Sequence, residues 1–317
     1  MQTKLQWDAD VLEPVFRELY SIEMDKKIDY IPKMYSVENS DKAIESLEGI
    51  GGEGLIKPWS ESSNMVFYDD VNELWQKYFT HSKYSLGRQI DRDFIDDLKL
   101  TAIKDRIISL ADATYKSIQM QGVESFKNAF LTTTALRYNN TVYNAATPDG
   151  LSLCSTAHLY SPDDASTQSN KGTLALSIDA WDSTTTLMQE WVDDRGNLMA
   201  VMPDTLIVAP YNRRKAFQIA GIDGKGGGYE PGNANHNINI YEGAVTVVVN
   251  PFLTNRYDWF AIDSSRMRRF HKWFNRRKPE NGTMTDFDTE TAKYKTICRH
   301  SYGSAHYSWI YGHDATS

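Results

Sequence analysis

The stretch from Asp91 to about Phe130 constrains the fold more than any other part of the chain. It contains no proline and a single glycine, Gly122. Its apolar side chains recur with a period of about 3.6 residues, the period of a helix that buries one face. These side chains are Phe94, Leu98, Ile103, Ile107, Leu110, Ala111 and Ile118. We predict a long helix with a break near Gly122, because glycine weakens a helix interior.

Two weaker helical patterns precede this helix. Between residues 8 and 27 apolar side chains recur at helical spacing and predict an N-terminal helix. They are Val11, Leu12, Val15, Phe16, Leu19 and Ile22. A shorter pattern at Ala43, Ile44 and Leu47 predicts a second, short helix.

A glycine cluster at residues 49–54 then breaks regular structure. Two extended runs are predicted after it, over residues 55–68 and 78–90. The turn-favouring residues between them could instead open a short helix through Leu74 and Trp75. A long, polar, weakly patterned segment is uncommon inside a compact domain and is usually functional or flexible. We therefore predict that this segment projects from the body as a long loop.

The second half of the chain has a different character. Residues 138–175 are rich in Asn, Thr, Ser, Asp and Gly, which predicts loops with short strands. Ser177 is a predicted cap for a helix that carries Trp181 and Met188, and the turn-favouring residues 193–197 end that helix.

The remaining patterns are mostly those of strands. Residues 205–209 predict a buried strand that stops at Pro210 and leads into a short helix over residues 213–219. A glycine-rich loop over residues 221–232 follows. Further strands are predicted over residues 237–241, 244–249, 259–262, 268–274, 293–302 and 307–311. The predicted class is α+β.

Composition narrows the classes of function. The 317 residues include 34 Lys and Arg against 42 Asp and Glu, a net charge of −8. Proteins that grip DNA phosphates are usually basic, which argues against a dedicated DNA binder. Two cysteines cannot build a disulfide framework and fit a reducing compartment. The N-terminus lacks a secretion signal and no stretch nears the roughly 20 apolar residues of a membrane helix, so we expect a soluble, intracellular chain.

Patterns that would indicate catalysis or metal binding are weak. Cys154 lies near His158 and Cys298 near His300, but neither pair has the second pair of ligands that zinc sites show. Residues 221–228 lack the hydroxyl residue and the following helix of a phosphate-binding loop. Nucleophile-elbow and zinc-protease motifs are absent from the sequence. We predict no metal, no cofactor and no enzyme activity.

One basic cluster stands out in this acidic chain. It consists of Arg266, Arg268, Arg269, Lys272, Arg276, Arg277 and Lys278, interleaved with Phe270, Trp273 and Phe274. Positive charge beside aromatic rings is typical of nucleic-acid contact. We favour the alternative, a strand with a solvated edge that contacts an acidic neighbouring subunit, because complementary patches guide assembly.

Several stretches resemble segments of one protein family. Residues 91–97, DRDFIDD, resemble an acidic lead-in to a long helix, and residues 147–158 are similar to a "DG…L…H" segment. Residues 203–210, PDTLIVAP, match a P-x-x-L-x-V-x-P strand. Residues 247–263 resemble a hairpin of the form VVV-x-P-x-L followed by W-x-L-x-D, and Tyr302 with Gly303 fits a closing strand. In this order, the segments resemble tailed-bacteriophage major capsid (head) proteins of the Hong Kong 97 fold, closest to Mu-like major head subunits.

The resemblance implies an α+β, Hong Kong 97-type capsid fold in five parts. These are an N-terminal arm (residues 1–48), an extended loop (49–88), the spine helix with part of the peripheral domain (89–135), an apical domain (136–262) and the C-terminal strands of the peripheral domain (263–317). It also implies a major capsid protein that assembles into an icosahedral phage head around packaged double-stranded DNA. The alternatives are a bacterial nanocompartment shell of the same fold and an unrelated soluble α+β enzyme.

The expected site is a set of contacts between subunits. Its candidate residues are Lys57 and Trp59 in the loop and Arg268, Arg269, Lys272 and Arg276 in the basic cluster. The main expected partner is the chain itself, in homo-hexamers and homo-pentamers, with scaffold, portal and decoration proteins as further candidates. We expect the DNA to be enclosed without sequence-specific binding, and no membrane contact. The expected location is the virion, with assembly in the host cytoplasm.

Overall fold

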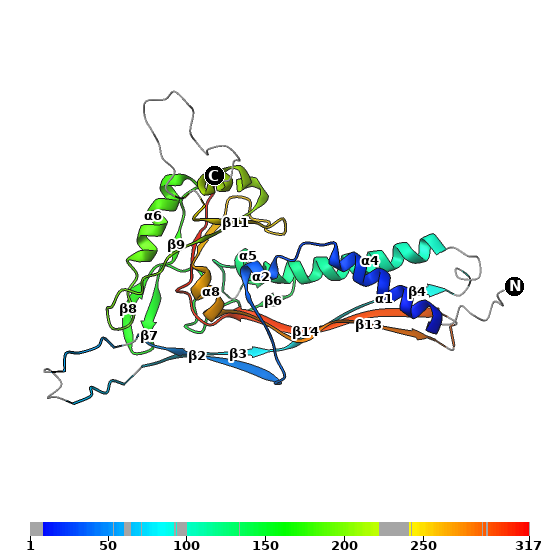
Figure 1. The fold of residues 1–317 in the computed structure, drawn as a ribbon, viewed down its shortest axis with the longest axis horizontal. Helices are drawn as coiled ribbons and strands as arrows, with labels where there is room; N and C mark the ends of the chain where they lie inside the picture. The colour runs from blue at the N-terminus through cyan, green and yellow to red at the C-terminus, as the bar shows by residue number, and fades with distance from the viewer. Residues whose placement is uncertain are drawn as a thin grey trace, which may run out of the picture. The chain divides into compact units, whose positions relative to one another are not determined.

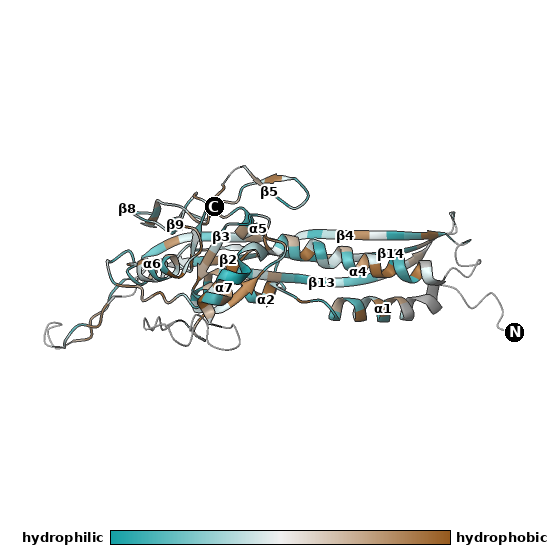
Figure 2. Cartoon of the chain, turned by 90° about the horizontal axis from the view of Figure 1, so that it is seen from above, coloured by the Kyte–Doolittle hydropathy of each residue, from teal (hydrophilic) through white to brown (hydrophobic). Residues whose placement is uncertain are grey.

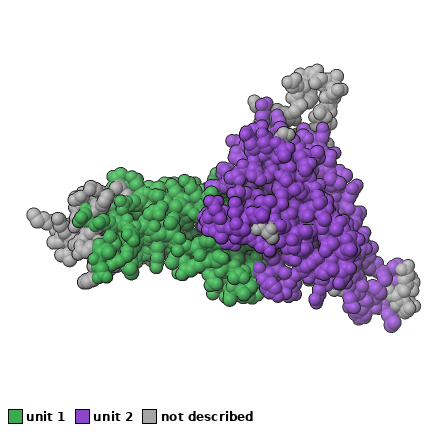
Figure 3. Space-filling view, turned by 180° about the vertical axis from the view of Figure 1, so that it is seen from behind, with its two compact units in different colours: residues 1–45, 79–122, 273–302 green, residues 46–78, 123–272, 303–317 purple. Residues whose placement is uncertain are grey.

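The computed structural model describes most of the chain (Figure 1). The described residues are 9–52, 54–59, 65–70, 72–91, 93, 100–132, 134–221, 241, 243–286, 288–289 and 291–316. The chain divides into two compact units (Figure 3). Unit 1 comprises residues 1–45, 79–122 and 273–302, and unit 2 comprises residues 46–78, 123–272 and 303–317.

Unit 1 packs helices against a four-stranded sheet. The strand order is β1 (Ser36–Asn39), β13 (His271–Thr285), β14 (Thr291–Ser304) and β4 (Ser82–Asp91). The helices are α1 (Ala9–Asp25), the short α2 (Ile31–Met34) and α4 (Leu100–Gly122). β14 and β4 pair antiparallel along their length, and α1 and α4 lie side by side along these strands in Figure 1 and Figure 2.

The apolar stripes of the two long helices form the core of unit 1. The buried cluster consists of Phe16, Tyr20, Ile90, Ile103, Ile107, Leu110, Ala111, Ala292 and Tyr294. Phe16 of α1 stacks on Tyr294 of β14, with ring centroids 4.6 Å apart. Figure 2 shows the apolar positions of α4 in brown between polar positions in teal. The predicted N-terminal and long helices are confirmed, and each buries one face.

The long helix breaks where the glycine predicts it. α4 ends at Gly122, and a short helix, α5 (Glu124–Lys127), follows. A Cβ at Gly122 would lie 3.0 Å from Cγ1 of Ile31 in α2, so the close packing of α2 against α4 favours glycine there. Most of the acidic lead-in, residues 91–97, lies outside the described residues.

Unit 2 is organised around a five-stranded sheet. The strand order is β11 (Thr246–Val249), β10 (Thr205–Val208), β12 (Trp259–Ile262), β15 (Ile310–His313) and β9 (Lys171–Gly172). β11 runs parallel to β10, and β12 runs antiparallel to it. Helix α6 (Ile178–Gln189) packs on β12, and helix α7 (Arg213–Ala220), preceded by the 3-10 turn η2 (Pro210–Asn212), packs on β10 and β11.

Short ladders and helices complete the described elements. The strand pairs are β2 (Ile44–Ile50) with β3 (Glu73–Thr80), β5 (Ala135–Leu136) with β6 (Val142–Tyr143), and β7 (His158–Ser161) with β8 (Asp164–Gln168). The remaining helix is α8 (Ser264–Phe270). No helix in the described ranges is long and apolar enough to cross a membrane.

Two local signals in unit 2 predict its elements correctly. The Ser177 hydroxyl accepts a hydrogen bond from the backbone N of Ala180 at 3.1 Å, so this residue caps α6 as predicted. The strand over residues 205–208 stops before Pro210, and α7 follows. The predicted loop over residues 221–232 and the strand over residues 237–241 lie almost entirely outside the described residues.

The short helix predicted at Ala43, Ile44 and Leu47 is wrong, and so is the alternative of a helix through Leu74 and Trp75. Ile44 and Leu47 lie in strand β2, and Leu74 and Trp75 lie in strand β3, which pairs with β2. Two or three apolar residues cannot distinguish a helical from an extended period. Pairing with a distant strand decides the structure here, because it supplies backbone hydrogen bonds that the local sequence does not encode.

Two strand predictions near the basic cluster also need correction. The strand over residues 268–274 is wrong in its first half, because α8 continues to Phe270 and β13 begins at His271. The Asp263 carboxylate caps α8 by accepting hydrogen bonds from the backbone N of Ser265 (3.0 Å) and Arg266 (3.1 Å). The hairpin over residues 247–263 is also wrong, because β10 lies between β11 and β12 in the sheet.

His313 is a buried, uncharged side chain in the core of unit 2. Its Nδ1 accepts a hydrogen bond from the backbone N of Leu174 at 3.1 Å. Its Nε2 lies 2.8 Å from Oγ of Thr184, whose own proton points to the carbonyl oxygen of Ala180. The imidazole stacks on the Trp259 ring, with centroids 4.0 Å apart. Burial lowers the pKa of His313 to about 4.

We expect stability to fall as the pH drops from about 6.5 to about 4. The unfolded chain protonates His313 near the upper value and the folded chain only near the lower one. The stabilising contribution is therefore present above the unfolded pKa and is lost as the pH falls. In denaturant unfolding, His313→Gln should reduce the pH slope of the unfolding free energy by up to about 1.4 kcal/mol per pH unit. An unchanged slope in a variant that still unfolds cooperatively would refute this.

Candidate subunit-interface surfaces

The segment between β2 and β3 is fixed at its base within unit 2. The backbone N of Gly51 donates to the carbonyl oxygen of Asn72 at 2.8 Å and so continues the strand pairing. The Asp194 carboxylate accepts hydrogen bonds from the backbone N of Gly52 and, at 2.9 Å, from Nδ2 of Asn72. One carboxylate therefore holds both chain segments of the base together.

The turn that presents this carboxylate is stabilised from within. The Asp193 carboxylate accepts hydrogen bonds from the backbone N of Arg195 (2.9 Å) and of Asn197 (2.8 Å). Gly196 has a φ of 80°, which an L side chain rarely adopts. The turn directs the Arg195 guanidinium to the Asp69 carboxylate, with which it forms an ion pair. The loop is thus clamped at both of its ends.

Beyond this base, the described loop residues expose apolar side chains to solvent. We call this set the loop surface, and it consists of Leu55, Ile56, Trp59, Met65, Val66, Phe67 and Tyr68. Ile56 is fully exposed and Tyr68 is 87% exposed. Nζ of Lys57 lies 3.8 Å from the centroid of the Phe67 ring. Of the two predicted loop contacts, Trp59 belongs to this set and Lys57 lies against it. Many exposed apolar side chains gathered on one segment indicate a surface for another molecule.

The basic cluster of the sequence is divided between the two units. In unit 2, Arg268 and Arg269 lie exposed on α8, and Lys272 is half-buried at the start of β13. Arg266 has an internal role, because its guanidinium is partly buried and donates to the carbonyl oxygen of Met199 at 2.7 Å. The part of the cluster available for contact in unit 2 is therefore the exposed end of α8.

The rest of the cluster belongs to β13 in unit 1. Arg276 lies 3.8 Å from the Asp41 carboxylate, and Arg277 forms an ion pair with Glu280. The hydrogen bond from Arg277 lowers the pKa of Glu280. Of the four predicted contact residues in the cluster, the structure brings Arg268 and Arg269 together on one helix, and it engages Arg276 within unit 1.

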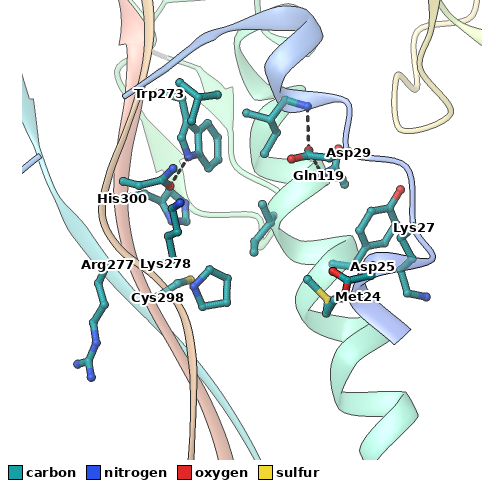
Figure 4. A pocket seen from close by; sticks show the side chains of 16 residues that line it. Met24, Asp25, Lys27, Asp29, Gln119, Trp273, Arg277, Lys278, Cys298 and His300 are labelled. Carbon is teal, nitrogen blue, oxygen red and sulfur yellow. Dashed lines mark hydrogen bonds between the residues drawn. The ribbon is translucent and has the colours of Figure 1, made fainter. Parts of the chain in front are cut away.

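A cavity of about 490 Å³ opens in unit 1 between α1, α4 and the strands β13 and β14 (Figure 4). On the strand side, Trp273 stacks on His300 with ring centroids 4.6 Å apart, and its Nε1 donates to Oδ1 of Asn275 at 2.9 Å. On the helix side, Gln119 donates to the Asp29 carboxylate at 2.8 Å. Each of these two hydrogen bonds joins two residues of the cavity wall.

Burial keeps the cysteine and histidine side chains of this cavity in their uncharged forms. Burial raises the pKa of Cys298 to about 11 and lowers that of His300 to about 4, so the thiol is protonated and the imidazole uncharged at neutral pH. Cys154 is completely buried, and His158 pairs with the Asp149 carboxylate. The described residues contain no group of three or more His, Cys, Asp or Glu side chains that could hold a metal ion.

The long helix packed along long strands, the sheet unit and the exposed loop define a Hong Kong 97-type capsid fold, and solved structures share it. The capsid of Myoviridae phage XM1 is similar over 90% of this chain and 92% of its own, with a TM-score of 0.51 and 8% identity. The structure from Mycobacterium phage Patience is similar over 99% of this chain and 90% of its own, with a TM-score of 0.52 and 10% identity. A virus-like particle from Pyrococcus furiosus is similar over 94% of this chain and 98% of its own, with a TM-score of 0.53 and 9% identity.

A family model described as phage capsid protein matches residues 64–312. The chain therefore belongs to the phage capsid protein family, and it is a structural protein, the major capsid protein of a phage head. No curated protein matches it. The family match favours a phage head over a nanocompartment shell, because the Pyrococcus particle is similar in fold alone. The narrower likeness to Mu-like head subunits stays a prediction.

The two residues that clamp the loop, Asp194 and Arg195, are not indicated by any pattern in the sequence. Asp194 contacts Asn72 across 122 positions of sequence, and Arg195 contacts Asp69 across 126. The turn-favouring composition of residues 193–197 is visible in the sequence, but it predicts only the end of α6. No local pattern indicates which distant segment such a turn holds.

Proposed function

We propose that this chain assembles with copies of itself into the homo-hexamers and homo-pentamers of an icosahedral phage head that encloses packaged double-stranded DNA. The observation that carries the proposal is the loop surface, an apolar set clamped at its base yet exposed to solvent. Identical subunits in rings use different surfaces toward their two neighbours. Many weak contacts in parallel then stabilise a closed shell.

In this proposal the parts of the chain take the roles that the resemblance implies. Unit 1 supplies most of the N-terminal arm and of the peripheral domain, with α4 as its spine helix. The apical domain, residues 136–262, contains the strands β9, β10, β11 and β12 of the five-stranded sheet. The fifth strand, β15, comes from residues 263–317, which the resemblance assigns to the peripheral domain. The extended loop of this proposal is the part of residues 49–88 that lies between β2 and β3, and it contacts a neighbouring subunit through Lys57 and Trp59. Residues 82–88 of the predicted loop belong instead to strand β4 in the sheet of unit 1. Lys272 and Arg276 add contacts to those of Arg268 and Arg269.

The remaining partners follow from charge and from the role in a head. A net charge of −8 supports enclosure of DNA without sequence-specific binding. Scaffold, portal and decoration proteins are the further partners, and assembly takes place in the host cytoplasm without a membrane. The protein has no enzyme activity in this account, since its work is the contact between subunits.

Self-assembly is the property to test. The purified chain, expressed with its scaffold, should form capsomers or particles of megadalton mass in light scattering. The expectation follows from the exposed loop surface, whose burial between subunits removes apolar area from water. A sharp monomer at 36.2 kDa across all protein concentrations would be the contrary result.

A further inference from the structure

Unit 2 carries a second basic patch, apart in sequence from the cluster at residues 266–278. Arg213, Arg214 and Lys215 form the first turn of α7, and all three are exposed. The guanidinium of Arg256 joins them, because it lies 4.2 Å from the ring centroid of Tyr211 in η2. We call these four cations and the tyrosine the α7 patch. None of the four cations forms an ion pair within the described ranges of the chain.

Folding of the chain alone does not account for this placement of charge. The N-terminus of a helix carries a partial positive charge, so cations in the first turn are unfavourable and anions are favourable there. The first turn of α7 contains no acidic residue, and Asn212 makes no side-chain cap. An anionic surface placed against this turn would satisfy both the helix end and the three side chains.

The same unit exposes an acidic surface on its other helix. Asp179, Asp182 and Glu190 lie at positions i, i+3 and i+11 of α6 and its C-cap, so they share one face. All three are exposed, and none forms an ion pair within the described residues. From Ile178 to Glu190 the chain contains no Lys or Arg. We call these three carboxylates the α6 face.

The two charged surfaces occupy different places on one sheet. α7 packs on β10 and β11, whereas α6 packs on β12, and their apolar sides share one core cluster. Opposite charges that are separate on one subunit but complementary between subunits fit a head-to-tail contact, the kind that generates rings.

We propose that the α7 patch of one copy contacts the α6 face of the next copy in a ring of subunits. This contact rests on the proposed self-assembly and names two of the surfaces that carry it. Each α7 patch meets the carboxylates of one neighbour, and each α6 face meets the cations of the other. Complementary charge fixes the register and direction of the ring and speeds its formation.

Charge exchange within one chain tests the contact. Reversing the α7 patch alone (Arg213→Glu, Arg214→Glu, Lys215→Glu) should reduce the yield of capsomers at least about tenfold, because like charges then face each other. Reversing the α6 face alone (Asp179→Lys, Asp182→Lys, Glu190→Lys) should have the same effect. The chain with all six changes has the wild-type net charge, and it should assemble to near the wild-type yield.

The outcomes separate the contact from the proposed function. A wild-type chain that never assembles contradicts the proposed function itself. A wild-type chain that assembles, with an α7 reversal that assembles equally well, overturns only this contact. So does a folded six-change chain that stays as defective as the α7 reversal. Normal shells with less bound nucleic acid in the α7 reversal would assign the patch to nucleic acid instead. If the six changes impair folding, the milder pair Lys215→Glu and Glu190→Lys gives the same comparison.

Discussion

Deletion of residues 56–67 should leave a folded subunit that no longer builds stable shells. The deletion removes most of the loop surface but spares Asp69, Asn72 and the turn at residues 193–197, so the clamped base and the pairing of β2 with β3 remain. A short Gly-Ser linker can close the gap, because the entropy of loop closure changes slowly with length. Far-ultraviolet circular dichroism and the unfolding midpoint should stay near wild type, while particle yield falls at least about tenfold.

Point substitutions give the matched control for this deletion. Ile56→Ser and Trp59→Ser remove exposed apolar side chains from the loop surface and should each weaken assembly. Leu198→Ser removes a side chain that is 69% exposed elsewhere in unit 2 and should leave assembly unchanged. If the deletion unfolds the protein, the segment is part of the core. If the deleted chain assembles normally, the loop surface is not a subunit contact.

The double substitution Arg268→Glu and Arg269→Glu should slow or abolish shell formation. Both side chains are exposed in the last turn of α8, where positive charge is favourable, so their reversal costs at most about 1 kcal/mol of folding free energy. Across an interface the same reversal places like charges together, which changes the association rate and its salt dependence. Circular dichroism and solubility should therefore stay near wild type while particle counts fall.

The conservative pair Arg268→Lys and Arg269→Lys is the control for charge. It keeps both positive charges and should assemble. Contact with nucleic acid makes a different forecast for the reversed pair: shells form, but with less encapsidated DNA and a shallower dependence of DNA binding on salt. Counting particles and packaged nucleic acid in the same preparations distinguishes the two, and intact shells with less DNA would refute the subunit contact.

Local signals predict the helices of this fold far better than they predict its strand pairing. α4 and its break at Gly122, and α6 with its cap at Ser177, follow from periodicity and capping. α8 is mistaken for a strand because charged and apolar residues mix over residues 268–274. The sequence Asp263-Ser264-Ser265 ahead of it is a cap signal that could have corrected this.

The sheet order of unit 2 depends on contacts that no local pattern contains. β11 and β12 are neighbours in sequence, yet β10 lies between them. A parallel pair such as β10 and β11 needs a crossover, and α7 lies within that connection. The hairpin prediction assumes that strands adjacent in sequence pair with each other. In the structure the buried strand β10 pairs with both β11 and β12 instead.

The candidate site is also only partly predictable, because some of its contacts join residues that are distant in sequence. The exposed position of Trp59 follows from its place in a weakly patterned segment after a glycine cluster. The clamp by Asp194 and Arg195 does not, because its partners are distant in sequence. The basic cluster is continuous in sequence but crosses from unit 2 to unit 1 after Lys272. Residues that are close in sequence, such as those of the basic cluster, therefore do not necessarily form one surface.

Electron microscopy of the purified wild-type protein, expressed with its scaffold, tests the central claim most directly. The account predicts closed, hollow shells of uniform diameter, built from a subunit whose loop and charged surfaces are covered by its neighbours. Fields that contain only single subunits or irregular aggregates, from protein that is folded by circular dichroism, would contradict it.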